Sequence, residues 1–199
     1  TDPTVTAVTA PTLTTSAVSG DEDTGIALDL STALSGSSGE VTVTISGVPD
    51  GATLSAGIRN ADGTWTLTQD QLSGLVVTPP ADSDEDFTLS VTATSTSLGG
   101  QTASTTSTLQ VIVNAVADAP QLTASAAAGT EDTAIGLTIA AALSDKDGSE
   151  TLSVTITGVP DGASLSAGTL NADGSWTLTP AQLSGLSLTP AANSDADFT

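Results

Sequence analysis

The sequence contains no cysteine, histidine, tyrosine or methionine, and only two basic residues, Arg59 and Lys146. Without histidine, cysteine and tyrosine, most acid–base, nucleophilic and transition-metal sites cannot be built. Without disulfides, a secreted domain of this size needs another source of stiffness, and a metal ion is one alternative. The formal net charge of −21 repels nucleic acids and anionic lipid surfaces and favours cations as partners.

Aromatic residues are scarce as well: each half of the chain has one tryptophan and one phenylalanine, namely Trp65, Phe87, Trp176 and Phe198. We expect all four in equivalent core positions, rather than on a platform that stacks a ligand. No segment resembles a signal peptide, a membrane span or a lipidation motif. High net charge can accompany disorder, but 38% of the residues are hydrophobic and they alternate with polar ones, which favours a folded chain.

The chain repeats itself with a period of 111 residues. VPDGATLSAG at residues 48–57 returns as VPDGASLSAG at 159–168, and NADGTWTLT at 60–68 returns as NADGSWTLT at 171–179. A unit of this length is much longer than a solenoid repeat, so each copy should be a complete domain with its own core.

The repeat register also predicts the domain boundaries. Residues 89–114 have no counterpart within the second copy, so we expect that copy to lack its last two strands. The chain is then a fragment of a longer array, which the absence of methionine favours, or a subunit that borrows the missing strands. The expected segments are the end of a preceding linker (1–10), a first β-sandwich repeat (11–114), an interdomain linker (115–120) and a truncated second β-sandwich repeat (121–199).

Alternating apolar residues predict strands and no helix of useful length. The clearest runs are 41–48, 64–68, 75–79, 87–95 and 107–116. Turn sequences lie between the strands at 49–51, 60–63 and 97–101, where glycine and asparagine tolerate positive φ. We interpret 127–143 as a strand followed by a loop or one helical turn.

About seven short strands in each copy predict an all-β fold of tandem immunoglobulin-like antiparallel β-sandwiches. The last two runs, 87–95 and 102–114, should form a long hairpin. Because this hairpin would carry the chain to the far end of the domain, we expect the two domains to be arranged end to end.

Acidic residues collect in the predicted loops, at 21–23, 82–86, 118, 131–132, 145–150 and 195–197. Three of these loops hold alternate carboxylates, whose side chains project to one side: Asp84 with Asp86, Asp145 with Asp147, and Asp195 with Asp197. Ca²⁺ takes about six to eight oxygen ligands and tolerates irregular geometry, whereas Mg²⁺ fits such a cage less well. The alternative is a set of solvated acidic loops that keep the protein soluble. Since the spacing lacks the distal glutamate of a single-loop calcium site, the ligands would come from several loops.

The segments FTLSVTATS (87–95), NAVADAP (114–120) and DKDGSETLSVTI (145–156) resemble a cadherin repeat. Further phrases, among them EDT, VPDGA, NADGSWTLT, AQLSGL and SDADFT, resemble the cadherin-like repeats of giant bacterial RTX-type adhesins exported by type I secretion. The resemblance covers residues 11–199. It implies a secreted, extracellular protein of the bacterial cell surface that serves cell adhesion and biofilm formation, with calcium ions between successive domains.

The resemblance implies two sets of calcium ligands. The set at the junction of the two repeats is Glu22, Asp84, Asp86, Asn114, Asp118, Asp145 and Asp147. The set toward a following repeat is Glu131, Asp195 and Asp197. The linker departs from the family pattern, because Val116 and Ala117 cannot ligate through their side chains, which implies fewer ions. The first copy has GSSG at 36–39 in place of DKDG, so its N-terminal end has lost the acids of the family.

The sequence leaves three functions open. The first is a calcium-stiffened extender that holds a distal binding domain away from the cell. In that case the partners are neighbouring repeats of the same chain, without nucleic acid or membrane insertion, and another domain binds the host or surface ligand. The alternative is a binding module that contacts a glycan or partner repeats directly, which exposed tryptophans would favour. An enzyme that uses paired carboxylates is the least favoured, because near-identical repetition suits a spacer better than a catalyst.

Overall fold

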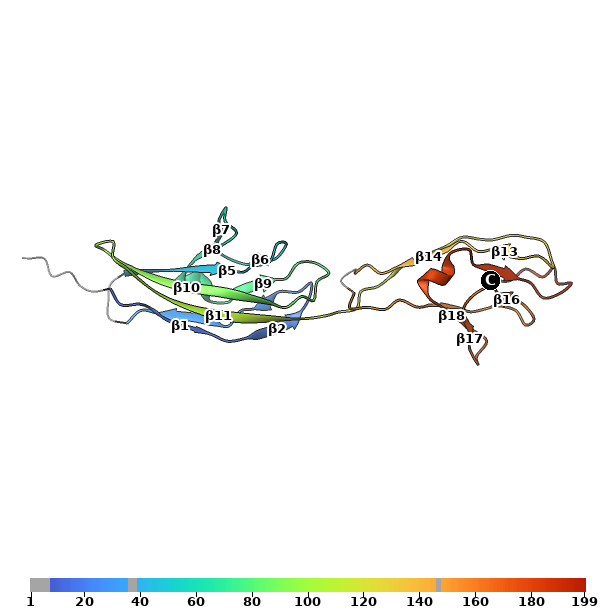
Figure 1. The fold of residues 1–199 in the computed structure, drawn as a ribbon, viewed down its shortest axis with the longest axis horizontal. Helices are drawn as coiled ribbons and strands as arrows, with labels where there is room; N and C mark the ends of the chain where they lie inside the picture. Colours follow the sequence, from blue (N-terminus) through green and yellow to red (C-terminus); the bar gives the residue numbers. More distant parts are fainter. Residues whose placement is uncertain (1–7, 36–38, 146–147) are drawn as a thin grey trace, which may run out of the picture. The chain divides into compact units, whose positions relative to one another are not determined.

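The computed structural model describes residues 8–35, 39–145 and 148–199. The chain divides into two compact units, Thr1–Val116 and Ala117–Thr199, and each has a hydrophobic core of its own. Nearly all regular structure is β-strand, which confirms the prediction of an all-β chain of the β-sandwich type (Figure 1). Within the described ranges, no helix has both the length and the apolar character needed to cross a bilayer.

Among its described residues, unit 1 has eleven strands and one 3₁₀ turn, which form where apolar and polar residues alternate. They are β1 (Thr12–Thr15), β2 (Val18–Asp21), β3 (Ile26–Ala27), β4 (Leu30–Ala33), β5 (Gly39–Ser46), β6 (Thr53–Leu54), β7 (Ile58–Arg59), β8 (Trp65–Thr68), η1 (Gln69–Leu72), β9 (Val76–Thr78), β10 (Phe87–Ser97) and β11 (Thr102–Asn114).

One large sheet of unit 1 has the strand order β2-β11-β10-β5-β8-β7. Two smaller sheets, β1-β4 and β3-β9-β6, supply the other side of the core. All pairs are antiparallel except β2 with β11, which run parallel from Val18 opposite Val111 to Asp21 opposite Asn114. The hydroxyl of Thr15 on β1 donates to the carbonyl of Thr108 at 2.9 Å, so side chains also tie β1 to β11.

The long hairpin of β10 and β11 supplies much of the core of unit 1, and its two strands run side by side (Figure 1). The prediction of this hairpin is confirmed. Its inward residues Leu89, Val91, Ala93, Leu109 and Val111 are fully buried. Full burial of a valine or leucine side chain stabilises a fold by about 1.5–3 kcal/mol relative to exposure, so the hairpin is a major source of stability.

Unit 2 has counterparts of the elements β1 to β9 of unit 1 except β2. They are β12 (Gln121–Ala124), β13 (Ile135–Gly136), β14 (Ile139–Ala142), β15 (Val154–Ile156), β16 (Ser164–Leu165), β17 (Thr169–Leu170), β18 (Trp176–Leu178), η2 (Pro180–Leu183) and β19 (Ser187–Thr189). The sheets are β12-β14, β13-β19-β16 and β15-β18-β17. Residues 127–143 thus hold two short strands, β13 and β14, and no helical turn.

The expectation of four equivalent aromatic core residues is wrong for the second copy. Trp65 is 9% exposed and Phe87 packs against the core of unit 1. Trp176 is only half-buried, and Phe198 is 42% exposed. The reason is that Phe87 begins β10, which lies between β5 and β11, whereas Phe198 has no such strands beside it among the described residues.

Two 3₁₀ turns were not anticipated from the sequence. A threonine precedes each turn, and its backbone N–H donates a hydrogen bond to the side chain of the glutamine three residues later. Thr68 donates to Gln71 at 2.9 Å, and Thr179 donates to Gln182 at 2.8 Å. This is half of a capping box, and it accounts for the repeated T-x-x-Q-L. Leu72 and Leu183, which end the turns, are buried in the two cores.

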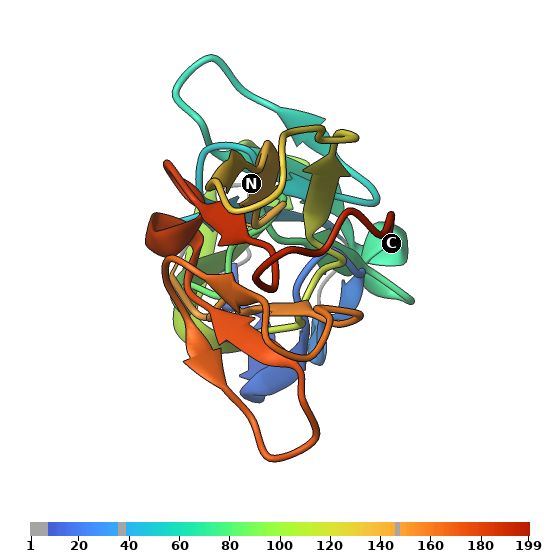
Figure 2. The same cartoon turned by 90° about the vertical axis from the view of Figure 1, so that its right-hand side faces the viewer.

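The hairpin of β7 and β8 projects from the body of unit 1 in both views (Figures 1 and 2). Its turn is held by side chains: the amide of Asn60 donates to the hydroxyls of Thr64 and Thr66, both at 2.9 Å. The Asp62 carboxylate accepts from the Thr64 hydroxyl at 2.7 Å and from the Thr64 N–H at 3.0 Å.

The hairpin of β17 and β18 in unit 2 carries the same turn network. Asn171 donates to the hydroxyls of Ser175 and Thr177, both at 2.9 Å. Asp173 accepts from the Ser175 hydroxyl at 2.6 Å and from the Ser175 N–H at 3.0 Å. The hydroxyl donors hold the pKa of Asp62 and of Asp173 below the ordinary value of 3.8, and the backbone N–H groups add to the effect.

Replacing Thr64 with valine should raise the pKa of Asp62 toward 3.8, because the strongest donor to its carboxylate is removed. Ser175→Ala should do the same for Asp173, whereas Thr64→Ser, which keeps the hydroxyl, should change little. Because the folded-state pKa is lowered, the stabilisation by Asp62 is present above the unfolded pKa and is lost as the pH falls through the folded value. Carboxyl carbon chemical shifts during an acid titration measure both midpoints, and equal midpoints in Thr64→Val and the parent would contradict the assignment.

Candidate functional site

Three segments that are far apart in the sequence meet at one end of unit 1. Residue 21 ends β2 beside residue 114, the last residue of β11. On the other side of β11, Phe87 at the start of β10 lies opposite Val111. The segments 21–23 and 82–86 therefore flank the end of β11, and together they contain seven of the carboxylates of the chain.

Glu22 and Asp86, two of the predicted ligands, are fixed to the end of β11 by hydrogen bonds. Glu22 is buried, its backbone N–H donates to the carbonyl of Asn114 at 3.0 Å, and its Oε1 accepts from the N–H of Val116 at 2.6 Å. Oδ1 of Asp86 accepts from the N–H of Val113 at 2.9 Å. The pairing of β2 and β10 with β11 thus brings the predicted residues Glu22, Asp86 and Asn114 to one end of the unit.

Asp23 and Asp82 form a further acidic pair that the sequence analysis did not select. Carboxylate oxygens of the two residues lie within 4.8 Å of each other, and the Asp23 Oδ1 accepts from the N–H of Asp82 at 3.0 Å. Both residues have left-handed backbones, with φ of 56° and 52°. The predicted ligand Asp84 lies in the same loop, two residues after Asp82. One signal in the sequence marks Asp82, which lies two residues before the alternate pair Asp84 and Asp86, but its partner Asp23 is 59 residues away.

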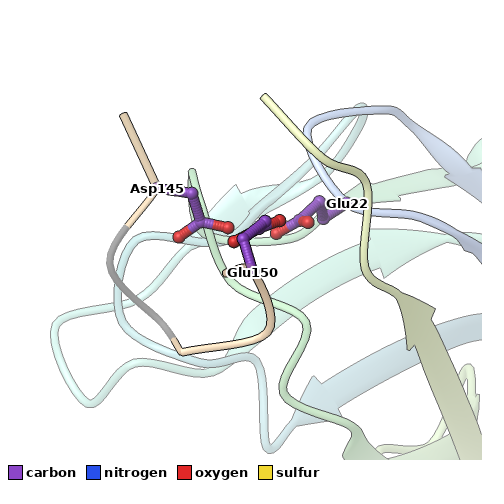
Figure 3. Close-up of side chains that lie close together, drawn as sticks. All are labelled: Glu22, Asp145 and Glu150. Atoms are coloured by element: carbon purple, nitrogen blue, oxygen red, sulfur yellow. The ribbon is translucent and has the colours of Figure 1, made fainter. Parts of the chain in front are cut away.

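In unit 2, Asp145 and Glu150 lie on the two sides of the loop that follows β14 (Figure 3). Asp145 is buried, and oxygens of the two carboxylates lie within 4.8 Å of each other. Asp147, which was predicted as a ligand, lies outside the described residues. Figure 3 also labels Glu22 of unit 1.

Glu150 was not selected from the sequence, although one signal marks it. The loop between Ala142 and Val154 is two residues longer than its counterpart between Ala33 and Val43. The second copy thereby gains acids where the first has glycine and serine. The first-copy segment 36–38, on which the predicted loss of acids depends, lies outside the described residues.

The remaining predicted ligands are less constrained. Asp118 is half-buried in the connection between β11 and β12. Glu131, Asp195 and Asp197 are exposed, and all three line one cavity of unit 2. Beside them, Oδ1 of Asp132 accepts from the N–H of Asn193 at 2.8 Å, which repeats the arrangement of Asp23 and Asp82.

The acidic end of unit 1 is a candidate site for a metal ion. Hard carboxylate and amide oxygens suit Ca²⁺, and the segments 21–23, 82–86 and 113–116 contain no basic residue to neutralise the acids. Arg59 lies elsewhere, 3.3 Å from Asp50. Carboxylates this close repel one another at distances shorter than the Debye length of about 8 Å, so salt screens them poorly and a divalent cation would relieve the repulsion.

Comparison with known proteins finds a similar structure but no family. No protein-family model matches the sequence, and no curated protein matches it. One solved structure that is similar is described as protocadherin gamma B2 extracellular cadherin domains 3-6, with 20% identity over 94% of this chain and a TM-score of 0.40. The chain spans 44% of the length of that structure. A similarity of this extent carries no argument about ligands or partners.

Replacing Glu22 with alanine should destabilise unit 1 in metal-free buffer, because the hydrogen bond from the N–H of Val116 to the buried Glu22 carboxylate is lost. A lost hydrogen bond of this kind costs about 1–3 kcal/mol. Glu22→Gln, which keeps an acceptor oxygen, should lose less, and Glu131→Ala at the equivalent exposed position should change little. Urea unfolding in EDTA measures the difference, and equal losses in Glu22→Ala and Glu131→Ala would contradict the structural role of Glu22.

Proposed function

We propose that this chain is a pair of non-catalytic structural repeats from an extracellular adhesin and that Ca²⁺ stiffens the connection between them. The observation that carries the proposal is the acidic end of unit 1, where Glu22, Asp86 and Asn114 are held together by the ends of β2 and β11 and the start of β10. These hydrogen bonds hold several acids in fixed positions beside residues 113–116, at the end of β11. Such a group of oxygen ligands suits a bound cation.

The proposed ligands come from both units and from their connection. Unit 1 would supply Glu22, Asp84, Asp86 and Asn114, the connection Asp118, and the loop after β14 Asp145, Asp147 and Glu150. Six residues, 115–120, separate β11 from β12, and an extended chain of this length spans about 20 Å at most. A connection of this length supports the proposal that two acidic loops share ions.

The same argument extends to the far end of unit 2. Glu131 corresponds to Glu22 in the repeat, and Asp195 and Asp197 correspond to Asp84 and Asp86. We assign these three residues to a second calcium site, toward a following repeat. An origin in a bacterial RTX-type adhesin of the cell surface rests on the repeated phrases of the sequence, and ligand binding is then the task of another domain.

A spacer is also favoured by where the tryptophans lie. Trp65 is buried and Trp176 is half-buried in the second core, so neither offers the exposed platform that a glycan site uses. The alternative, a module that contacts partner repeats directly, is supported by one observation. The projecting hairpins expose an apolar side chain each, Ile58 at 71% and Leu170 at 59%.

Calcium titration of the whole chain tests the proposal. Isothermal calorimetry should detect binding with a Kd of about 10⁻⁴–10⁻³ M or tighter, the range of extracellular calcium modules. Asp84→Asn with Asp86→Asn, and Asp145→Ala with Asp147→Ala, should each weaken binding by about tenfold or more, because each pair removes two charged ligands. Asp70→Asn with Asp161→Asn, at exposed positions outside these clusters, is the matched control.

Small-angle scattering separates stiffening from binding alone. Saturating Ca²⁺ should increase the radius of gyration of the chain and EGTA should reduce it, while the two ligand-deficient variants should need about tenfold more Ca²⁺ or more for the same increase. Calorimetry without detectable heat, or binding that the control pair weakens as much as the ligand pairs do, would overturn the calcium site. Binding with unchanged scattering would overturn the stiffening role.

A further inference from the structure

The first strands of unit 1 run in the same direction as its last strand, β11. Residues 18–21 of β2 pair in parallel with residues 111–114, and β2 lies beside β11 (Figure 1). The thirteen residues of β11 span about 40 Å at about 3.3 Å per residue. Backbone pairing with β2 covers only the C-terminal part of this length, and side chains connect the rest.

Two side-chain hydroxyls extend the parallel contact back to residue 9. Oγ of Ser95, which lies opposite Ala103 of β11, donates to the carbonyl of Thr9 at 2.7 Å. Oγ1 of Thr105 donates to the carbonyl of Pro11 at 2.7 Å. Because Pro11 has no N–H, a regular backbone ladder cannot run through it, and the hydroxyl supplies the connection instead.

These hydroxyls stand at positions where the strands otherwise carry apolar side chains. Ser95 is 1% exposed and continues the inward series of β10 after Ala93. Thr105 is half-buried and precedes Leu109 in the inward series of β11. Since a buried hydroxyl lowers the stability of a fold unless it is hydrogen-bonded, the partners at residues 9 and 11 account for both side chains.

We propose that residues 9–21 and 103–114 form a clamp through which unit 1 bears a mechanical load along the chain. The hydrogen-bonded positions follow one another in the same order on both sides of the clamp. They are 9, 11, 15 and 18–21 on one side, and 103 (through Ser95), 105, 108 and 111–114 on the other.

The direction of pulling decides how this clamp is loaded. When residues 9 and 115 are pulled apart, the force acts along β11, and the hydrogen bonds of the clamp share it and must break together. When residues 9 and 98 are pulled apart, the force acts at one end, because residue 98 lies in the turn that joins β10 to β11. The bonds then break one after another.

The clamp deepens the proposed spacer role and rests on it, because a spacer carries the load between its two ends. It consists of hydroxyl and backbone hydrogen bonds and needs no calcium. Measurements in EDTA therefore test the clamp separately from the calcium site, so that the failure of one leaves the other standing.

Single-molecule force spectroscopy of the 199-residue chain in EDTA tests the proposal. Because the chain has no cysteine, two introduced cysteines define the pulling points. Thr9→Cys with Ala115→Cys loads the clamp along β11, and Thr9→Cys with Leu98→Cys loads it from one end; all three side chains are exposed. At equal force, unit 1 should unfold at least about tenfold more slowly in the first geometry, because several hydrogen bonds must break together.

Removing two hydroxyls should weaken the clamp mainly in one direction. Thr15→Val with Thr105→Val keeps the shape of the side chains and removes two hydrogen bonds of the clamp. Unfolding along β11 should then be about tenfold faster, with a smaller change when the force acts at one end. Thr92→Val with Thr106→Val is the matched control, because these hydroxyls bond to each other at 2.9 Å outside the clamp, and it should leave both rates unchanged.

Equal unfolding rates of the parent in the two pulling geometries would overturn the clamp, and this comparison does not require the valine variants to fold. Equal acceleration by the two double valine variants under load along β11 would overturn the role of the hydroxyls in it.

Discussion

The pairing of the β10–β11 hairpin with the rest of unit 1 is the interaction on which the other features depend. The hairpin supplies fully buried leucines and valines to the core and connects β5 on one side with β2 on the other. Its ends also organise the acidic residues, since Glu22 is bonded to residues 114 and 116 and Asp86 to residue 113. Core, sheet closure and candidate metal site are therefore consequences of one pairing.

Comparison of the two units distinguishes the features that depend on the β10–β11 hairpin from those that depend on the local sequence. The turns that are closed by nearby side chains are the same in both copies, as the networks around Asp62 and Asp173 illustrate. Features that need the hairpin differ. β2 pairs only with β11, and residues 127–130, which correspond to β2, form no strand in unit 2. The local hydrogen bonds are thus the same in both units, whereas the burial of single residues such as Phe198 and the pairing of the segment equivalent to β2 differ.

The charge of the chain is distributed in a way that fits this division. Strand residues are mainly threonine, serine, valine and leucine, and most acids lie in loops, where carboxylates can be hydrated or bind a cation. A domain with one tryptophan, one phenylalanine and no disulfide has few sources of rigidity beyond its aliphatic core. Ions at the ends of such domains would add stiffness where the core adds none, and this is the reasoning behind the proposed spacer role.

The sequence alone indicated the strands β5, β8, β9, β10 and β11, the turns between them, the long hairpin and the acidic loops, because alternation and turn residues act over a few positions. Glu22, Asp86 and Asn114 were indicated by the resemblance of the sequence to cadherin repeats. Only the tertiary structure decided that Asp23 meets Asp82 and that Asp145 meets Glu150, because each meeting depends on the path of the backbone between the two residues. Likewise, the exposure of Phe198 could not follow from its similarity to Phe87, since burial depends on the strands that neighbour a residue and not on its own sequence context.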